Sequence, residues 1–222
     1  KLKLDDDKMV LYAVTDRAWV GESTLAFQVE QAIIGGATFV QLREKDLPYD
    51  EFLKQANEVK KITDRYGVPF VINDNIEVAL ACGADGVHVG QKDLEASRVR
   101  EIVGKDKILG VSAQTLEQAV LAEKSGADYL GVGAIFYTPT KPEAELTSLE
   151  TLKEICKNVS IPVVAIGGIT KNNIMQLSDT GVKGVALVSA IFAQKDIKAT
   201  CQELYRLTKM MLERPDTTLP TK

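Results

Sequence analysis

The sequence contains one histidine and three cysteines in 222 residues. Cys82, Cys156 and Cys201 form no CxxC motif and no Cys/His spacing, which excludes the usual patterned metal site. An odd, unpatterned set of cysteines is typical of a reducing compartment, so we expect a cytoplasmic protein. The histidine, His88, lies inside the apolar run GVHVG, and we interpret it as a satisfied interior residue rather than a catalytic base.

Other absences narrow the class of protein further. No apolar stretch approaches the ~18 residues of a membrane span, and the N-terminal KLKLDDDK has no apolar core of a signal peptide. The net charge of -4 and the pI near 5.2 argue against binding of nucleic acid or of an anionic membrane. We expect a single domain over residues 9–212, with flexible ends at 1–8 and 213–222.

Short apolar runs alternate with longer amphipathic stretches along the whole chain. Helices are expected, for example, at Tyr49–Tyr66 and Leu116–Ser125. Eight parallel strands alternating with helices predict an α/β fold, a single (β/α)₈ TIM barrel. The eight predicted strands are Val10–Val14, Thr38–Leu42, Pro69–Ile72, Gly86–Val89, Ile108–Val111, Tyr129–Val132, Val163–Ile166 and Gly184–Val188.

An open doubly wound sheet is the alternative fold, but it usually carries GxGxxG after the first strand, and here that position reads TDRAWVGES. A weak repeat supports the barrel. Glycines at Gly36, Gly83, Gly126 and Gly181 each precede a predicted strand, spaced by about two βα units, and each would supply a left-handed helix C-cap.

Cationic side chains gather at the end of the second predicted strand, in TFVQLREK. Side chains alternate across a strand, so Gln41, Arg43 and Lys45 should project to one side. Such a cluster at the end of a buried strand is costly unless a ligand uses it, and two cations suggest a multiply charged anion. The alternative is a solvated strand end with a Glu44–Lys45 surface pair.

Two acidic residues follow the next two strands. Asp74 and Asp93 come after adjacent strands, and their carboxylates can converge over the barrel mouth. Two carboxylates beside a polyphosphate are a usual setting for Mg²⁺. The alternative is that both are turn residues or helix N-caps. An acid/base or acyl-transfer site could also use these carboxylates, but the chain offers no histidine partner.

A second anion site is expected after strands seven and eight. GGI, with Gly167 and Gly168, and VSAI, with Ser189, occupy the phosphate-binding place of such barrels. The glycines could instead simply make a tight turn. The sixth loop, residues 133–148, is the longest and could act as a lid. It would add hydroxyl donors and a positive charge from Thr138, Thr140 and Lys141.

The two sites together predict a mouth built for diphosphate and Mg²⁺ without an evident nucleophile. That combination suits the departure of a diphosphate group, with most of the rate coming from electrostatic stabilisation of the leaving charge.

Several motifs in order resemble those of the thiamine-phosphate synthase (thiamine-phosphate pyrophosphorylase) family, from about Tyr12 to Ile191. They are YAVTDR, GGATFVQLREKD, INDN, GADGVHVGQKD, GVSAQT, GADYLGVGAIF, TPTK, AIGGIT and ALVSAI. The resemblance implies a transferase that joins hydroxymethylpyrimidine diphosphate to a thiazole phosphate, plain or carboxylated. Thiamine phosphate and diphosphate would be the products, Mg²⁺ the cofactor, and departure of diphosphate the first step.

The resemblance also implies a role for each matching residue. Asp74 and Asp93 would hold Mg²⁺, and Arg43, Lys45, Ser112 and Lys141 would be the catalytic groups. The pyrimidine diphosphate would contact Gln41, Leu42, Arg43, Glu44, Lys45, Asn73, Ser112 and Lys141. The thiazole phosphate would contact Thr138, Pro139, Thr140, Gly168, Val188 and Ser189.

The sixth loop departs from the family pattern, which usually has proline before the first threonine, another residue between the threonines and a glycine shortly after. Here Tyr137 precedes Thr138, Pro139 lies between the threonines, and PEAELTSLE has no glycine. Two rivals remain: a thiazole tautomerase on the same barrel, which lacks the QLREK and paired-aspartate set, and a catalytically silent phosphate-sensing barrel. The oligomeric state is open, with a homo-oligomer as one alternative.

Overall fold

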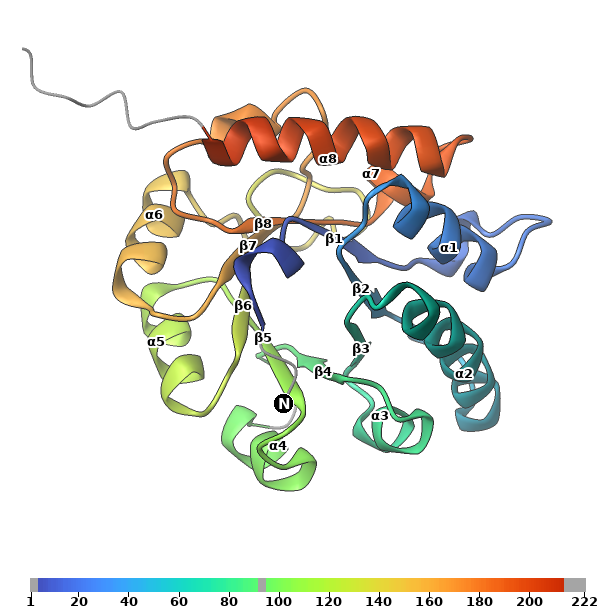
Figure 1. The fold of residues 1–222 in the computed structure, drawn as a ribbon. Helices are drawn as coiled ribbons and strands as arrows, with labels where there is room; N and C mark the ends of the chain where they lie inside the picture. Colours follow the sequence, from blue (N-terminus) through green and yellow to red (C-terminus); the bar gives the residue numbers. More distant parts are fainter. Residues whose placement is uncertain (1–3, 92–94, 214–222) are drawn as a thin grey trace, which may run out of the picture.

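The computed structural model describes residues 4–91 and 95–213, which fold into a closed barrel of parallel strands in the order β1 to β8 (Figure 1). The predicted TIM barrel is therefore confirmed. The strands are β1 Leu11–Val14, β2 Phe39–Leu42, β3 Phe70–Asn73, β4 Gly86–Val89, β5 Ile108–Ala113, β6 Tyr129–Val132, β7 Val163–Ile166 and β8 Gly184–Leu187.

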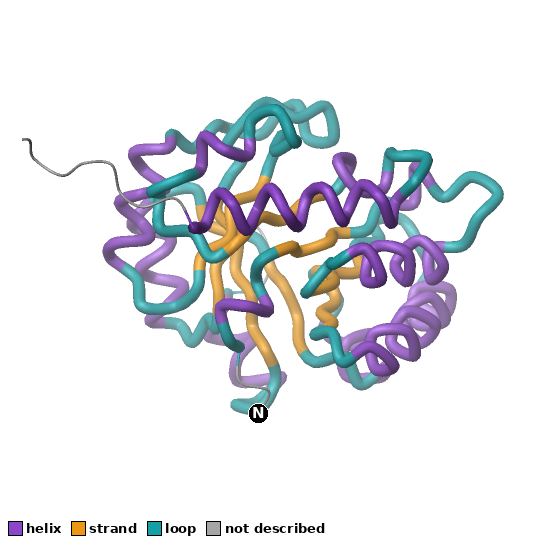
Figure 2. Tube along the Cα trace, turned by 45° about the horizontal axis from the view of Figure 1, so that its top comes forward, coloured by secondary structure: helices purple, strands orange, loops and turns teal. Residues whose placement is uncertain are grey.

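Helices surround the strands, as the tube view makes plain (Figure 2). The α-helices are α1 Leu25–Gly35, α2 Tyr49–Tyr66, α3 Ile76–Cys82, α4 Ala96–Val103, α5 Leu116–Lys124, α6 Leu149–Asn158, α7 Ser189–Phe192 and α8 Ile197–Glu213. Short 3-10 helices lie at η1 Asp6–Lys8, η2 Arg17–Trp19 and η3 Ile174–Leu177. Across the described residues, no helix is both long and apolar enough to cross a bilayer.

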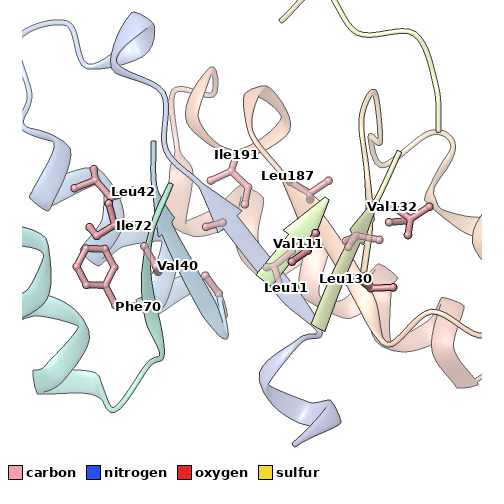
Figure 3. Packing of buried hydrophobic residues seen from close by; sticks show 14 of the residues in the cluster. Leu11, Val40, Leu42, Phe70, Ile72, Val111, Leu130, Val132, Leu187 and Ile191 are labelled. Atoms are coloured by element: carbon pink, nitrogen blue, oxygen red, sulfur yellow. The ribbon is translucent and has the colours of Figure 1, made fainter. Parts of the chain in front are cut away.

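Two apolar cores follow from the alternation of side chains along each strand. The larger core lies between strands and helices and includes Val40, Leu42 and Ile72 (Figure 3). The smaller core fills the barrel interior and includes Tyr12, Phe39, Tyr129 and others. Because the interior is packed with side chains, only residues at the ends of the strands and in the loops can contact a ligand.

Predicted element bounds agree with the structure to within two residues. The glycine repeat is real, because Gly36, Gly83, Gly126 and Gly181 precede β2, β4, β6 and β8, and all four have positive φ. The left-handed cap is confirmed only at Gly83, which ends α3. Gly36 caps α1 with a φ of 123°, outside the left-handed helical region, Gly126 follows the cap residue Ser125, and Gly181 follows the 3-10 helix η3 and a turn, so it caps no α-helix.

Part of the N-terminal segment that was expected to be flexible is described by the structure. Residues 1–3 and 214–222 of the expected flexible ends lie outside the described residues. Asp6 lies in η1, and its carboxylate pairs with the Lys183 ammonium at 3.0 Å, at the end of the barrel opposite the loops that follow the strands.

Candidate active site

The clearest feature of the mouth is an ion pair between the loops that follow β2 and β3. The Lys45 ammonium lies 3.0 Å from Oδ2 of Asp74, and both side chains are partly exposed. The two residues lie beyond adjacent, paired strands, Phe39–Leu42 and Phe70–Asn73. The fold therefore brings together the cation and the carboxylate that were predicted to share one site.

Arg43 lies beside this pair in sequence and is available to a ligand. Its backbone N–H donates to Oγ1 of Thr15 at 3.0 Å, which fixes the strand end against β1. Its guanidinium is partly exposed and makes no ion pair or hydrogen bond with any residue that the structure describes. A guanidinium at a strand end without an acidic partner has its full charge available for an anion.

Glu44 pairs with Arg17 and not with Lys45, the partner that the alternative of a solvated strand end required. Its carboxylate, only 4% exposed, receives both a 2.7 Å and a 3.2 Å hydrogen bond from the Arg17 guanidinium. Lys45 bonds to Asp74 instead, so the surface pair between Glu44 and Lys45 is absent. The forked Arg17–Glu44 contact links the loop after β1 to the loop after β2.

The turn after β3 separates two roles that the sequence could not distinguish. Asn75 is a helix N-cap, since its Oδ1 accepts the backbone N–H of Val78 at 2.9 Å. Asp74 is not a cap, and it adopts a left-handed backbone conformation with φ of 63°. A non-glycine residue in this region is uncommon and is often held there for a functional reason. Asn73, 8% exposed, ends β3 beneath this turn.

Two residues of the QLREK segment are buried, one between the strands and the helices and one inside the barrel. Leu42 is fully buried in the core between strands and helices, so its side chain faces away from the barrel mouth. Gln41 is 4% exposed inside the barrel, where its Nε2 donates to the Tyr12 hydroxyl at 2.7 Å. The strand face thus divides into a buried amide below and the two cations Arg43 and Lys45 above.

A chain of hydrogen bonds crosses the barrel interior from Gln41 to Ser112. The hydroxyls of Tyr12 and Tyr129 are 2.6 Å apart, and Tyr129 lies 2.9 Å from Nδ1 of His88. Nε2 of His88 lies 2.8 Å from Oγ of Ser112. His88 is therefore a satisfied interior residue, as its place in an apolar run indicated. Ser112 lies within β5, one residue before its end.

Burial sets the protonation of this chain. It lowers the pKa of His88 to about 4, with a smaller opposing contribution from Asp74, so the imidazole is neutral at pH 7. Burial also raises the pKa of Tyr12 and of Tyr129 above the ordinary phenol value. All three groups are uncharged, which suits hydrogen bonding in an apolar interior.

The glycines after β7 allow two loops to approach closely. Gly167 and Gly168 have φ of 100° and 64°, and a Cβ on Gly168 would lie 2.4 Å from the carbonyl oxygen of Tyr137. The backbone N–H of Phe136 donates to the Gly167 carbonyl at 3.0 Å. These glycines therefore hold the sixth loop against the end of β7, and a turn alone does not account for them.

The sixth loop places its polar residues in one turn. The backbone N–H of Lys141 donates to the Thr138 carbonyl at 3.3 Å, and Oγ1 of Thr138 accepts the N–H of Thr140 at 3.3 Å. The Lys141 ammonium is exposed and has no acidic partner within the described residues. Pro139, between the threonines, and Tyr137, which is 69% exposed, both project outward.

The end of β8 completes this side of the mouth. Val188 follows the strand and precedes the short helix α7, which begins at Ser189. β7 and β8 are paired, with Ile166 opposite Ala186, so Gly168 and Ser189 leave the barrel side by side. This is the place where barrels of this class bind phosphate.

One described carboxylate at the mouth is a candidate ligand for a divalent cation. Asp93 lies outside the described residues, and elsewhere no group of three or more His, Cys, Asp or Glu side chains is arranged around a metal position. Asp74 offers a hard carboxylate oxygen at the mouth. That donor fits Mg²⁺, which is usually held by one or two carboxylates together with substrate phosphates and water.

Comparison with known proteins connects this mouth to a family. The model of the family described as thiamine monophosphate synthase matches residues 11–191. The chain belongs to the thiamine monophosphate synthase family. The resemblance seen in the sequence is thereby confirmed, and the family assignment makes the protein a transferase of thiamine biosynthesis.

Individual relatives of the thiamine monophosphate synthase family agree over nearly the whole chain. A thiamine-phosphate synthase of Ruminiclostridium cellulolyticum is 55% identical, covering 93% of this chain and 97% of the relative. One from Clostridium tetani is 54% identical, over 87% and 93% of the two chains. The solved thiamine phosphate pyrophosphorylase of Pyrococcus furiosus is 39% identical, with a TM-score of 0.86 over 93% and 98% of the two chains.

Sequence reasoning missed the interior residues of the site. Tyr12 and Tyr129 were placed in strands with no role, although they carry the chain between Gln41 and Ser112. A signal was present, since a tyrosine in a fully buried strand needs a partner for its hydroxyl. The sequence could not say that the two hydroxyls meet, because they are 117 residues apart in the chain.

Proposed function

We propose that the protein joins hydroxymethylpyrimidine diphosphate to a thiazole phosphate, plain or carboxylated, giving thiamine phosphate and diphosphate, together with carbon dioxide when the thiazole is carboxylated. The observation that carries the proposal is the group at the ends of β2 and β3. There the Lys45 ammonium and the Asp74 carboxylate form an ion pair at 3.0 Å. Arg43, two residues before Lys45 in the sequence, has no acidic partner among the described residues. Such a group suits a substrate that brings a multiply charged diphosphate and a bound cation.

In the proposed reaction, the bond between the pyrimidine methylene carbon and the diphosphate oxygen breaks, and the electron pair leaves with diphosphate. The lone pair of the thiazole nitrogen then forms the new bond to that carbon. Arg43, Lys45 and Lys141 would stabilise the negative charge that grows on the leaving diphosphate. No general base is required, in keeping with a neutral, buried His88.

Asp74, and Asp93 by resemblance, would hold Mg²⁺, which when bound would neutralise part of the diphosphate charge. The contacts of Asp74 fit this role, because Lys45 occupies only Oδ2. On the other side of the mouth, Gly168 and Ser189 would bind the thiazole phosphate through backbone N–H groups, with Thr138 and Thr140 adding hydroxyls.

Ser112 and Gln41, at the two ends of the hydrogen-bonded chain, would contact the pyrimidine from the floor of the mouth. Both are polar, and both are held by the same hydrogen-bonded chain. Asn73, 8% exposed at the end of β3, would lie between the pyrimidine and the diphosphate. The side chain of Leu42 would serve only to pack the strand, leaving its backbone for any contact with substrate.

The deciding experiment is incubation of the purified protein with both substrates and Mg²⁺, with detection of thiamine phosphate and diphosphate in equal amounts. Omitting either substrate, or adding a chelator, should abolish both products. A phosphate-sensing barrel predicts no product and equal rises in melting temperature with and without Mg²⁺. A thiazole tautomerase predicts isomerised thiazole without release of diphosphate.

A further inference from the structure

The interior chain of hydrogen bonds has a direction, and that direction is set at Gln41. Nε2 of an amide can only donate, and it lies 2.7 Å from the Tyr12 hydroxyl. Tyr12 therefore accepts from Gln41 and uses its own hydrogen toward Tyr129, 2.6 Å away. Tyr129 in turn has its hydrogen left for Nδ1 of His88, at 2.9 Å.

The direction continues through the histidine. A neutral imidazole that accepts at Nδ1 carries its only hydrogen on Nε2. Nε2 lies 2.8 Å from Oγ of Ser112, so His88 donates to the serine oxygen. Ser112 is partly exposed near the end of β5, and its own hydrogen is then left to point into the mouth.

The opposite direction is chemically possible and would give the opposite result. If the group at position 41 accepted from Tyr12, each tyrosine would have to donate the other way. His88 would then carry its hydrogen on Nδ1, and Ser112 would use its hydrogen on Nε2. Serine would present only lone pairs to the mouth. The two ends of the chain are therefore coupled.

Packing keeps the chain in register. The ring of Phe39 stacks on that of Tyr12 at a centroid distance of 4.6 Å and meets Tyr129 edge-on at 5.5 Å. Gly110 provides the space for Tyr129, since a Cβ there would lie 2.1 Å from the phenol carbon Cζ. Fully buried rings in such a slot have little freedom to turn away from their partners.

We propose that Tyr12 and Tyr129 are positioning residues, which couple the amide of Gln41 to the hydroxyl of Ser112 through His88. With Nε2 of Gln41 on Tyr12, the chain holds Ser112 as a hydrogen-bond donor toward the substrate. It also leaves the amide oxygen of Gln41 as an acceptor. That these groups meet the pyrimidine rests on the proposed function, whereas the direction of the chain does not.

The test is to determine which ring nitrogen of His88 carries the hydrogen, by nitrogen NMR of the full-length protein labelled at histidine. The protein has a single histidine, so both ring-nitrogen signals belong to His88. We expect a hydrogen on Nε2 and an unprotonated, hydrogen-bonded Nδ1. A histidine with its hydrogen mainly on Nδ1, or an equal mixture of the two forms, would overturn the proposal.

The coupling is tested by Gln41→Glu, measured over a pH range up to about 10, because burial raises the pKa of a carboxyl above its ordinary value of about 4.3. A carboxylate only accepts, so the hydrogen of His88 should move from Nε2 to Nδ1. Adding Tyr12→Phe to this variant breaks the connection and should restore the hydrogen to Nε2. An unchanged histidine in Gln41→Glu would refute the coupling.

Two further variants separate hydrogen bonding from packing. Tyr129→Phe should move the Nδ1 signal to that of a ring nitrogen without a hydrogen bond. Phe39→Leu, which disturbs the same rings but removes no hydrogen bond, should leave both signals in place. If Gln41→Glu fails to fold, the wild-type signals and the Tyr129→Phe shift still decide the question, and an unshifted Nδ1 would count against the proposal.

Kinetics give the link to the reaction. Tyr129→Phe should lower kcat about tenfold, the effect of one lost hydrogen bond, while KM for the diphosphate changes less than about twofold. An equal loss in kcat and in folded protein would indicate a structural role only. A wild-type protein that makes no thiamine phosphate would remove the proposed function, while the NMR result would still stand or fall separately.

Discussion

Replacing Asp74 by asparagine tests the centre of the proposed site with little disturbance of the backbone. Asp74 has a φ of 63°, and asparagine adopts this left-handed conformation as readily as aspartate. The substitution removes one negative charge and keeps the size of the side chain. It breaks the ion pair with Lys45 and removes the one described carboxylate proposed to hold Mg²⁺.

The structure gives different magnitudes for stability and for activity. The Lys45–Asp74 pair is exposed at 48% and 34%, and such surface pairs contribute about 0.2–1 kcal/mol. The melting temperature of a chain of this size should therefore fall by no more than about 4 °C. Loss of a metal ligand reduces the stabilisation of the transition state by several kcal/mol. We therefore expect kcat/KM to fall by about 100-fold or more.

The assay is formation of thiamine phosphate over a range of Mg²⁺ concentrations, together with thermal unfolding. We expect the variant to need more Mg²⁺ for half of its maximal rate. Asp179→Asn is the matched control, because Asp179 also has a left-handed backbone, with φ of 61°, but precedes β8 at the opposite end of the barrel. It should retain wild-type activity and the wild-type Mg²⁺ requirement.

The reasoning about Asp74 would be refuted by a loss of about fivefold or less in Asp74→Asn, with no change in the Mg²⁺ requirement. A loss of that size equals about 1 kcal/mol, the upper value for an exposed ion pair. Asp74 would then act only by holding Lys45 in place.

Three further predictions concern the barrel itself. Gly110→Ala should lower the free energy of unfolding in urea by about 1–3 kcal/mol, because a Cβ would lie 2.1 Å from the buried phenol ring behind it. Arg100→Ala should cost about 3 kcal/mol, because its guanidinium donates to three backbone carbonyls and one carboxylate with only 19% of its side chain exposed. Between pH 7 and pH 4.5 the protein should lose about 2 kcal/mol of stability through His88. Its pKa is lowered to about 4 in the folded state, so the unfolded chain binds the extra proton and stability falls as the pH falls below about 6.5.

Each of these predictions has a control within the chain. Gly131→Ala should cost less than Gly110→Ala, because its Cβ would lie 3.4 Å from the nearest atom, and equal costs would contradict the steric argument. Arg98→Ala removes an exposed pair and should change stability by less than about 0.5 kcal/mol. His88→Gln should flatten the acid dependence, and an unchanged slope would assign it to other groups.

The sequence by itself determined the fold and most of the mouth. Apolar strands alternating with amphipathic helices admit few architectures, and eight such units close into a barrel. Because parallel strands all end at the same edge, the sequence predicts that Lys45 and Asp74 share one site, and the two side chains do form an ion pair. The lone histidine was also interpreted correctly, since a polar residue in an apolar strand has to be satisfied inside.

Only the tertiary structure decided which side chains meet. The partner of Glu44 is Arg17, because the loop after β1 folds over the strand end, and no local pattern fixes that contact. The meeting of Tyr12 with Tyr129 depends on barrel closure, which turns side chains of β1 and β6 toward each other across an interior that local sequence does not describe. Strand order follows from periodicity and chain direction, whereas contacts across the barrel depend on the tilt and packing of all eight strands at once.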